Sequence, residues 1–106
     1  DKDFLSRKTI QYMTANHLGK NIIRNTPLYL PGLGYGFGLG FAVRESDGLS
    51  SWPGSEGEYF WAGYAGTYFW IDPKEELIVI SMTQSVTNRM KFRLLLRNLV
   101  YQAIIN

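Results

Sequence analysis

Few side chains of this 106-residue chain could do chemistry, and none of them forms a familiar catalytic pair. His17, the only histidine, could act as a general base. Near the end of a predicted helix, however, an imidazole more often complements the helix dipole. Glu56 and Glu58 could form an acid pair, but glycoside hydrolysis needs both acids in one pocket. We therefore expect neither His17 nor these two carboxylates to be catalytic.

A serine nucleophile is also unsupported within the sequence. Such a serine needs an activating base within hydrogen-bond reach. The chain contains neither G-x-S-x-G nor S-x-x-K, in which a lysine one helical turn after the serine acts as the base. No lysine lies three residues after any serine, namely Ser6, Ser46, Ser50, Ser51, Ser55, Ser81 and Ser85. Cysteine is absent and the acids lack metal-ligand spacing, so we expect no metal and no other cofactor.

The stretch GLGYGFGLGF, residues 32–41, has a glycine at every second position. A dinucleotide-binding loop needs the spacing G-x-G-x-x-G. In the three possible registers, the last glycine is replaced by Phe37, Leu39 or Phe41. A period of two is typical of a β-strand, and glycines on one strand face indicate a close neighbour. We therefore expect a helix or another backbone to pack against the glycine face.

The elements that must position any site follow from periodicity and turn residues. We predict a helix at 6–16 with Ser6 as its N-cap, strands at 33–44, 58–63, 67–72 and 77–83, and a helix at 88–105. The loop between the first two strands carries Trp52, which we expect to be exposed. The order predicts an α+β fold, an antiparallel sheet of about four strands flanked by an N-terminal and a C-terminal helix. The last helix has one wide apolar face, made of Phe92, Leu95, Leu96, Leu99, Val100, Ala103 and Ile104.

Charge and hydropathy exclude some partners. Eleven Lys and Arg oppose nine Asp and Glu, for a net charge of +2. Arg89, Arg93 and Arg97 form one helical stripe, which we interpret as a solvated face rather than a nucleic-acid footprint. No apolar run approaches the ~20 residues that span a bilayer. The polar start without Met does not resemble a signal peptide, and we expect that the chain was cut from a longer one.

Three stretches resemble one known family: SRKTIQYMTANHL, YGFGLGF and GEYFWAGYAGTYFWIDPKEELIVISMTQ. They are similar to the C-terminal part of serine β-lactamase-like hydrolases, which include class C β-lactamases, DD-peptidases and family VIII carboxylesterases. The resemblance extends from Leu5 to Ile104. It implies that residues 1–106 are a single C-terminal piece of a larger β-lactamase- or transpeptidase-like domain. It leaves the compartment open between the periplasm and the cytoplasm of a bacterium.

The resemblance also implies roles for individual residues. Trp61, Ala62 and Gly63 match the family motif K-T-G, which is W-x-G in esterase-like members, and would border the substrate. Gly63 would keep the strand bare for an acyl group, and the Tyr64 amide would be an oxyanion-hole donor. Trp61 replaces the lysine that would pair with a β-lactam carboxylate, which favours ester or small-amide substrates. Trp52 would lie at the pocket rim. A purely structural role stays open for both tryptophans.

Two functions stay open at this point. The chain could line the cleft of a serine hydrolase that acts on a small-molecule ester, amide or β-lactam, with the nucleophile on a missing N-terminal part. Alternatively, it could be a non-catalytic sheet-and-helix interaction module that self-associates or binds a partner chain. In both cases unpaired sheet edges favour association with the missing part or with a second copy. An upstream S-x-x-K in the same reading frame would favour the first function, and a start codon directly before Asp1 the second.

Overall fold

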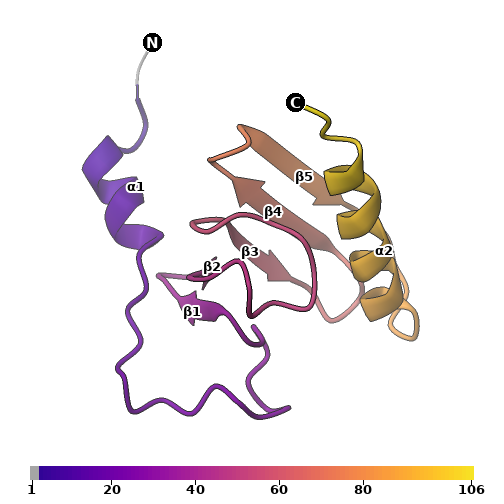
Figure 1. Ribbon diagram of the computed structural model, residues 1–106, viewed down its shortest axis with the longest axis horizontal. Coiled ribbons are helices and arrows are strands. Elements are labelled where there is room, and N and C mark those ends of the chain that lie inside the picture. Colours follow the sequence, from indigo (N-terminus) through magenta and orange to yellow (C-terminus); the bar gives the residue numbers. More distant parts are fainter. Residues whose placement is uncertain (1–2) are drawn as a thin grey trace.

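The computed structural model describes residues 3–106, which form two helices and one five-stranded sheet (Figure 1). The strands are antiparallel and follow one another in the sheet in chain order. This arrangement confirms the predicted α+β class. The elements are α1 (Arg7–Met13), β1 (Tyr35–Phe37), β2 (Ala42–Arg44), β3 (Tyr59–Ala62), β4 (Tyr68–Asp72), β5 (Leu77–Ser81) and α2 (Arg89–Gln102).

The glycine-rich stretch forms a hairpin, so the single strand predicted at 33–44 is wrong. β1 and β2 are joined by a two-residue turn at 39–40, closed by the Gly38 N–H, which donates to the Phe41 carbonyl at 2.7 Å. Gly40 has a φ of 99°, in the left-handed region that favours glycine. The alternation of glycine and apolar residues continues through this turn, and the sequence pattern therefore hides the reversal. The sheet has five strands in place of about four.

The glycine face of the hairpin packs against the chain that follows α1. The Leu39 N–H donates to the Met13 carbonyl at 2.8 Å, and the His17 N–H donates to the Phe37 carbonyl at 2.9 Å. A Cβ at Gly38 would lie 2.3 Å from the Met13 carbonyl oxygen. The close backbone neighbour expected beside these glycines is confirmed, and it belongs to this chain.

Helix α1 begins as predicted and ends early. Ser6 is its N-cap, and the Ser6 Oγ accepts a hydrogen bond from the Thr9 N–H at 3.1 Å. The helix stops at Met13 rather than at residue 16. The residues after it bind β1 instead, and Asn16 Oδ1 accepts a hydrogen bond from the Phe37 N–H at 3.2 Å. The hairpin contact thus takes precedence over a last helical turn.

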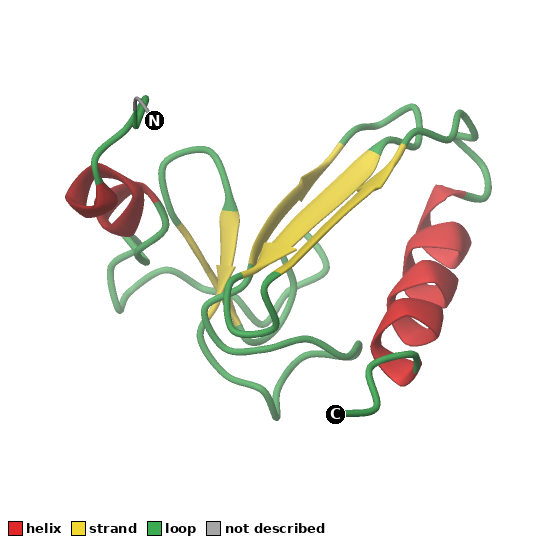
Figure 2. Ribbon diagram, turned by 90° about the horizontal axis from the view of Figure 1, so that it is seen from above, coloured by secondary structure: helices red, strands yellow, loops and turns green. Residues whose placement is uncertain are grey.

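Helix α2 lies along one face of the sheet and packs on it with only part of the apolar face that its sequence pattern predicts (Figure 2). Leu96, Val100 and Tyr101 pack against the core, which consists of Tyr35, Ala42, Phe60, Tyr68 and Trp70. The residues predicted to face the sheet include Phe92, Leu95 and Leu99, which are 44%, 51% and 49% exposed. Arg97 is the buried residue of the helix. The prediction that the three arginines of this helix form a solvated face is therefore wrong. Arg97 is buried because it pairs with the buried carboxylate of Glu58.

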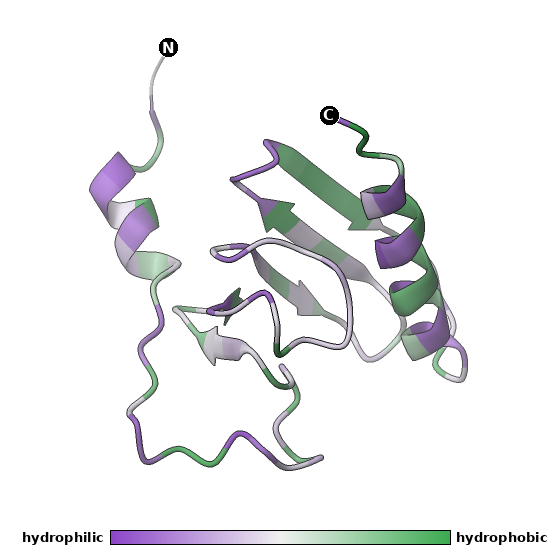
Figure 3. Cartoon of the chain, viewed as in Figure 1, coloured by the Kyte–Doolittle hydropathy of each residue, from purple (hydrophilic) through white to green (hydrophobic). Residues whose placement is uncertain are grey.

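The sheet face opposite α2 is apolar and largely open. Ile78 and Ile80 of β5 are 66% and 69% exposed, and Figure 3 shows the hydrophobic colour along β5. Within residues 3–106 no helix lies on this face (Figure 2). In the same part of the chain, neither helix combines the length and hydropathy that crossing a membrane requires.

The contact between Gly38 and Met13 makes a first prediction. Gly38→Ala would push a methyl group into the Met13 carbonyl oxygen, which is backbone and can move little. We expect the free energy of unfolding to fall by about 1–3 kcal/mol, the usual effect of overpacking. Urea denaturation followed by circular dichroism measures this loss.

Gly48→Ala is the matched control, because a Cβ at Gly48 meets no atom within 4 Å. We expect it to change stability by about 0.5 kcal/mol or less. Equal stabilities for the two variants would contradict the close packing of the hairpin on the chain after α1.

Candidate functional site

The five residues predicted to form the site line one cleft. Its volume is ≈730 Å³, and it lies between the end of β3, the loop before that strand and the first turns of α2. Its walls contain all of the predicted residues, namely Trp52, Trp61, Ala62, Gly63 and Tyr64. Helix α2 contributes a further set, which includes Arg89, Met90, Arg93 and Leu94. The fold thus brings together residues that span loop, strand and turn, while their roles remain predictions.

A tight turn from β3 to β4 carries Gly63 and Tyr64. The Gly63 N–H donates to the Thr67 carbonyl at 2.8 Å, and the Gly66 N–H donates to the Gly63 carbonyl at 3.2 Å. Among residues 3–106 the Tyr64 N–H has no acceptor, so it is free to bind a ligand. A Cβ at Gly63 would lie 2.3 Å from Thr67 Oγ1. The hydroxyl of Thr67 thus fills the space beside Gly63 that we expected to be bare for an acyl group.

Two arginines of α2 reach this turn from the helix. Arg93 Nη2 donates to the Gly63 carbonyl at 2.5 Å and to the Thr67 carbonyl at 3.2 Å. The Arg89 guanidinium lies 4.5 Å from the centre of the Tyr64 ring, a cation–π contact. Burial lowers the pKa of Arg93, helped by the charge of Arg89, yet a guanidinium stays protonated at neutral pH. The sequence showed the spacing of these arginines but not their partners, because backbone carbonyls have no sequence signature.

Glu58, at the start of β3, is the centre of a buried ionic network. Its carboxylate pairs with Arg97 through Oε2 and with Arg44 through Oε1, the latter at 3.2 Å. All three side chains are at most 3% exposed. The Tyr35 hydroxyl also donates to this carboxylate. The Tyr101 hydroxyl lies 3.3 Å from it and donates to Asp72 at 2.7 Å. Burial raises the pKa of both tyrosines, together with the charge of Glu58 for Tyr35 and the hydrogen bond to Asp72 for Tyr101, so they remain protonated donors.

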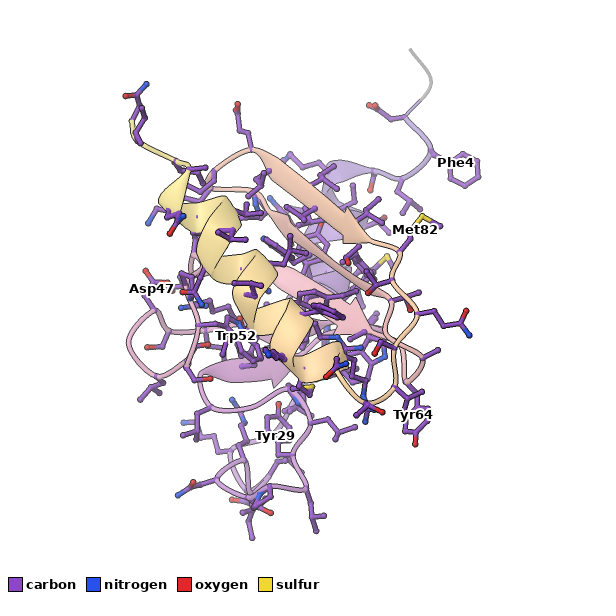
Figure 4. All side chains as sticks on the ribbon, turned by 90° about the vertical axis from the view of Figure 1, so that its right-hand side faces the viewer. Phe4, Tyr29, Asp47, Trp52, Tyr64 and Met82 are labelled. Carbon is purple, nitrogen blue, oxygen red and sulfur yellow. The ribbon has the colours of Figure 1, made fainter. Side chains whose placement is uncertain are left out.

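The same network fixes the loop at the cleft rim. Arg44 donates to the Trp52 carbonyl at 3.1 and 3.2 Å, and Arg97 donates to the Pro53 carbonyl at 3.3 Å. The Trp52 indole N–H donates to the Tyr35 hydroxyl at 2.7 Å. Trp52 is therefore partly buried rather than exposed, which corrects the sequence expectation. Figure 4 shows Trp52 close to α2 and Tyr64 projecting outward.

The other polar candidates lie outside any catalytic arrangement. His17 Nε2 lies 2.7 Å from the Tyr12 carbonyl, and the imidazole packs edge-on against the Tyr12 ring. Ser51 lines the cleft, but within the described residues no hydrogen bond joins it to a base. In that part of the chain no three His, Cys, Asp or Glu side chains gather as metal ligands would. The residues that line the cleft thus include several aromatic side chains and Tyr64, whose N–H has no acceptor among residues 3–106.

Comparison with known proteins finds a matching family. A family model described as Beta-lactamase matches residues 5–103. The match includes all five predicted site residues and the ionic network around Glu58. No curated protein matches the chain significantly.

The ionic network makes a second prediction. Glu58→Gln keeps the shape of the side chain but removes the negative charge between Arg44 and Arg97. Removing one partner of a buried ion pair leaves an uncompensated charge, and we expect a loss of about 3–5 kcal/mol in the free energy of unfolding. Urea denaturation at neutral pH measures it.

Glu56→Gln is the matched control, since Glu56 is exposed and two residues earlier. We expect it to change stability by about 0.5 kcal/mol or less. If Glu58→Gln were equally mild, the buried carboxylate would not hold the two arginines in place.

Proposed function

The chain belongs to the beta-lactamase family, and we propose that it forms one wall of the active-site cleft of a serine hydrolase. The observation that carries this proposal is that Tyr64, whose N–H has no acceptor within residues 3–106, lines one cleft together with Trp52 and Trp61. An acyl hydrolase needs such a donor where negative charge develops on the carbonyl oxygen of its substrate. The nucleophile would come from another part of the protein, because no S-x-x-K occurs in these 106 residues.

In this proposal the chain stabilises the intermediate and does not attack the substrate. A serine Oγ from the companion segment adds to the substrate carbonyl, and the resulting oxyanion accepts a hydrogen bond from the Tyr64 N–H. The intermediate collapses to an acyl-enzyme and releases the alcohol or amine, and water then hydrolyses the acyl-enzyme. Removing one oxyanion donor from a hydrolase typically costs about 3–4 kcal/mol of transition-state stabilisation.

The cleft walls favour esters or small amides. Trp61 supplies an apolar surface at the position where the K-T-G motif places an ammonium group. Three cations of α2 line the cleft. Arg93 binds the Gly63 carbonyl and Arg89 lies against the Tyr64 ring, whereas Lys91 forms no ion pair within residues 3–106. A β-lactam carboxylate would find an indole rather than an ammonium at position 61.

The open sheet face supports a companion segment of the same hydrolase. Ile78 and Ile80 expose a continuous apolar surface on the side of the sheet that α2 does not cover. Apolar surfaces of this kind mark interaction sites. We propose that residues 1–106 are the C-terminal portion of a β-lactamase-like domain, whose remainder covers this face and brings the serine to the cleft.

The test joins the chain to the segment encoded upstream in its reading frame and treats the assembly with a fluorophosphonate probe. We expect the label on the serine of an S-x-x-K in that segment, and none on residues 1–106, because these residues lack an activated serine. We also expect the assembly to hydrolyse a p-nitrophenyl ester faster than a β-lactam. Stoichiometric labelling of the isolated chain would contradict the proposal.

Substitution at position 61 sharpens the substrate assignment. Trp61→Lys restores the ammonium, and we expect the ratio of β-lactam to ester hydrolysis (as kcat/KM) to rise about tenfold or more, as a charged hydrogen bond allows. Trp61→Phe is the control, because it keeps an apolar wall without a charge. An unchanged ratio in Trp61→Lys would show that position 61 does not contact the substrate.

The alternative is a non-catalytic interaction module, which the exposed face of β5 favours. In that case the chain would form a stable homodimer, or a complex with an unrelated protein, and ester hydrolysis would not appear in any assembly. Light scattering of the isolated chain, read beside the labelling experiment, separates the two functions. A homodimer without labelling anywhere favours the module.

A further inference from the structure

Arg93 binds the peptide group that carries the proposed oxyanion donor. The Gly63 carbonyl and the Tyr64 N–H belong to the same peptide unit. Arg93 Nη2 donates to that carbonyl at 2.5 Å, and the Gly66 N–H donates to it at 3.2 Å. The acceptor end of this peptide is thus doubly hydrogen-bonded, while its donor end has no partner within residues 3–106.

A cation at the carbonyl changes the donor at the other end of the peptide. Hydrogen bonds through one peptide group polarise each other, so a positive charge on the oxygen side makes the N–H a stronger donor. The effect is larger in a part-buried site than in water, because the local dielectric is lower. The Arg93 side chain is part-buried, and its Nε is buried without a partner in the described chain.

The contact also fixes the direction in which the N–H points. Arg93 donates to the Thr67 carbonyl at 3.2 Å as well, so it joins both ends of the turn. On the other side of the turn, the Ser85 N–H donates to the Ala65 carbonyl at 2.8 Å. The turn that contains the Gly63–Tyr64 peptide is therefore held between α2 and the segment that follows β5. An oxyanion donor is useful only when it is oriented before the charge develops.

We propose that Arg93 is a positioning residue that orients and polarises the Gly63–Tyr64 peptide, so that the Tyr64 N–H is a stronger and better directed oxyanion donor. The role in catalysis rests on the proposed function, whereas the effect of Arg93 on the peptide can be measured without any substrate. Arg93 itself touches no substrate in this account. It acts through a backbone carbonyl, which an alignment of side-chain motifs would not reveal.

Nuclear magnetic resonance of the isotopically labelled 106-residue chain tests the inference without any substrate. The variants are Arg93→Met, which removes the cation, and Arg93→Lys, which keeps a charged donor. Lys91→Met is the control, because it removes a charge from the same helix without touching the turn. The readouts are the Gly63 carbonyl carbon shift, the Tyr64 amide proton shift and the exchange rate of the Gly63 N–H.

In Arg93→Met we expect both resonances to move upfield, and the Gly63 N–H to exchange about tenfold faster, because a charge-assisted hydrogen bond to the turn is lost. Arg93→Lys should move the resonances less, and Lys91→Met should leave them unchanged. If Arg93 only held the turn in place, Arg93→Met would speed exchange of the Gly63 N–H without moving the Tyr64 amide resonance. This result would overturn the inference.

The unmodified chain provides a second test in case Arg93→Met does not fold. The Arg93 Nη2 protons should be protected and resolved, because two carbonyls restrict rotation of the guanidinium. Rapidly averaged Nη2 protons would also overturn the inference. If the Tyr64 resonance responds but no assembly hydrolyses an ester, the proposed function alone fails. If hydrolysis is found without this response, the inference about Arg93 alone fails.

Discussion

The carboxylate of Glu58 between two buried arginines is the interaction on which the rest of the structure depends. A charge buried without a partner is strongly destabilising, so Arg44, Arg97 and Glu58 must be buried together or not at all. Arg44 comes from β2, Glu58 from the start of β3 and Arg97 from α2. The second buried acid, Asp72 at the end of β4, accepts a hydrogen bond from Tyr101 of α2. Through Glu58, Tyr101 and Asp72 the network joins three strands and the helix.

This network sets the rotation of α2 about its own axis. That rotation in turn decides which α2 side chains line the cleft. With Arg97 directed into the sheet, Arg93 lies one turn earlier on the same face and reaches the turn after β3. Arg89 lies one further turn away and stacks on Tyr64. The apolar residues Phe92, Leu95 and Leu99 are consequently turned outward. Both guanidiniums of the network also hold carbonyls of the loop that places Trp52 at the rim.

The sequence allowed much of this architecture to be predicted. Ser6 marked the start of α1, and the strands after residue 58 fell close to their observed positions because their turns carry strong local signals. The hairpin in the glycine run was missed because its turn repeats the pattern of its strands. The buried face of α2 was predicted only in part, because apolar periodicity assumes that arginine stays in water. Arg97 is an exception because it pairs with the buried Glu58. The two residues are 39 positions apart, so no local sequence pattern indicates the pair. The candidate site residues were predicted by resemblance, whereas the Arg93 contact could only be seen in three dimensions.

The central claim is that the Glu58–Arg97 pair docks α2 on the sheet. A double-mutant cycle with Glu58→Gln, Arg97→Gln and the double variant measures the coupling free energy of this pair directly from urea denaturation. The account predicts that the double variant is no less stable than Glu58→Gln alone, because removing the second charge relieves the first. The coupling then equals or exceeds the loss in Arg97→Gln, about 3 kcal/mol or more. Additive losses, with a coupling near zero, would show that the two side chains are buried independently, and would contradict the account.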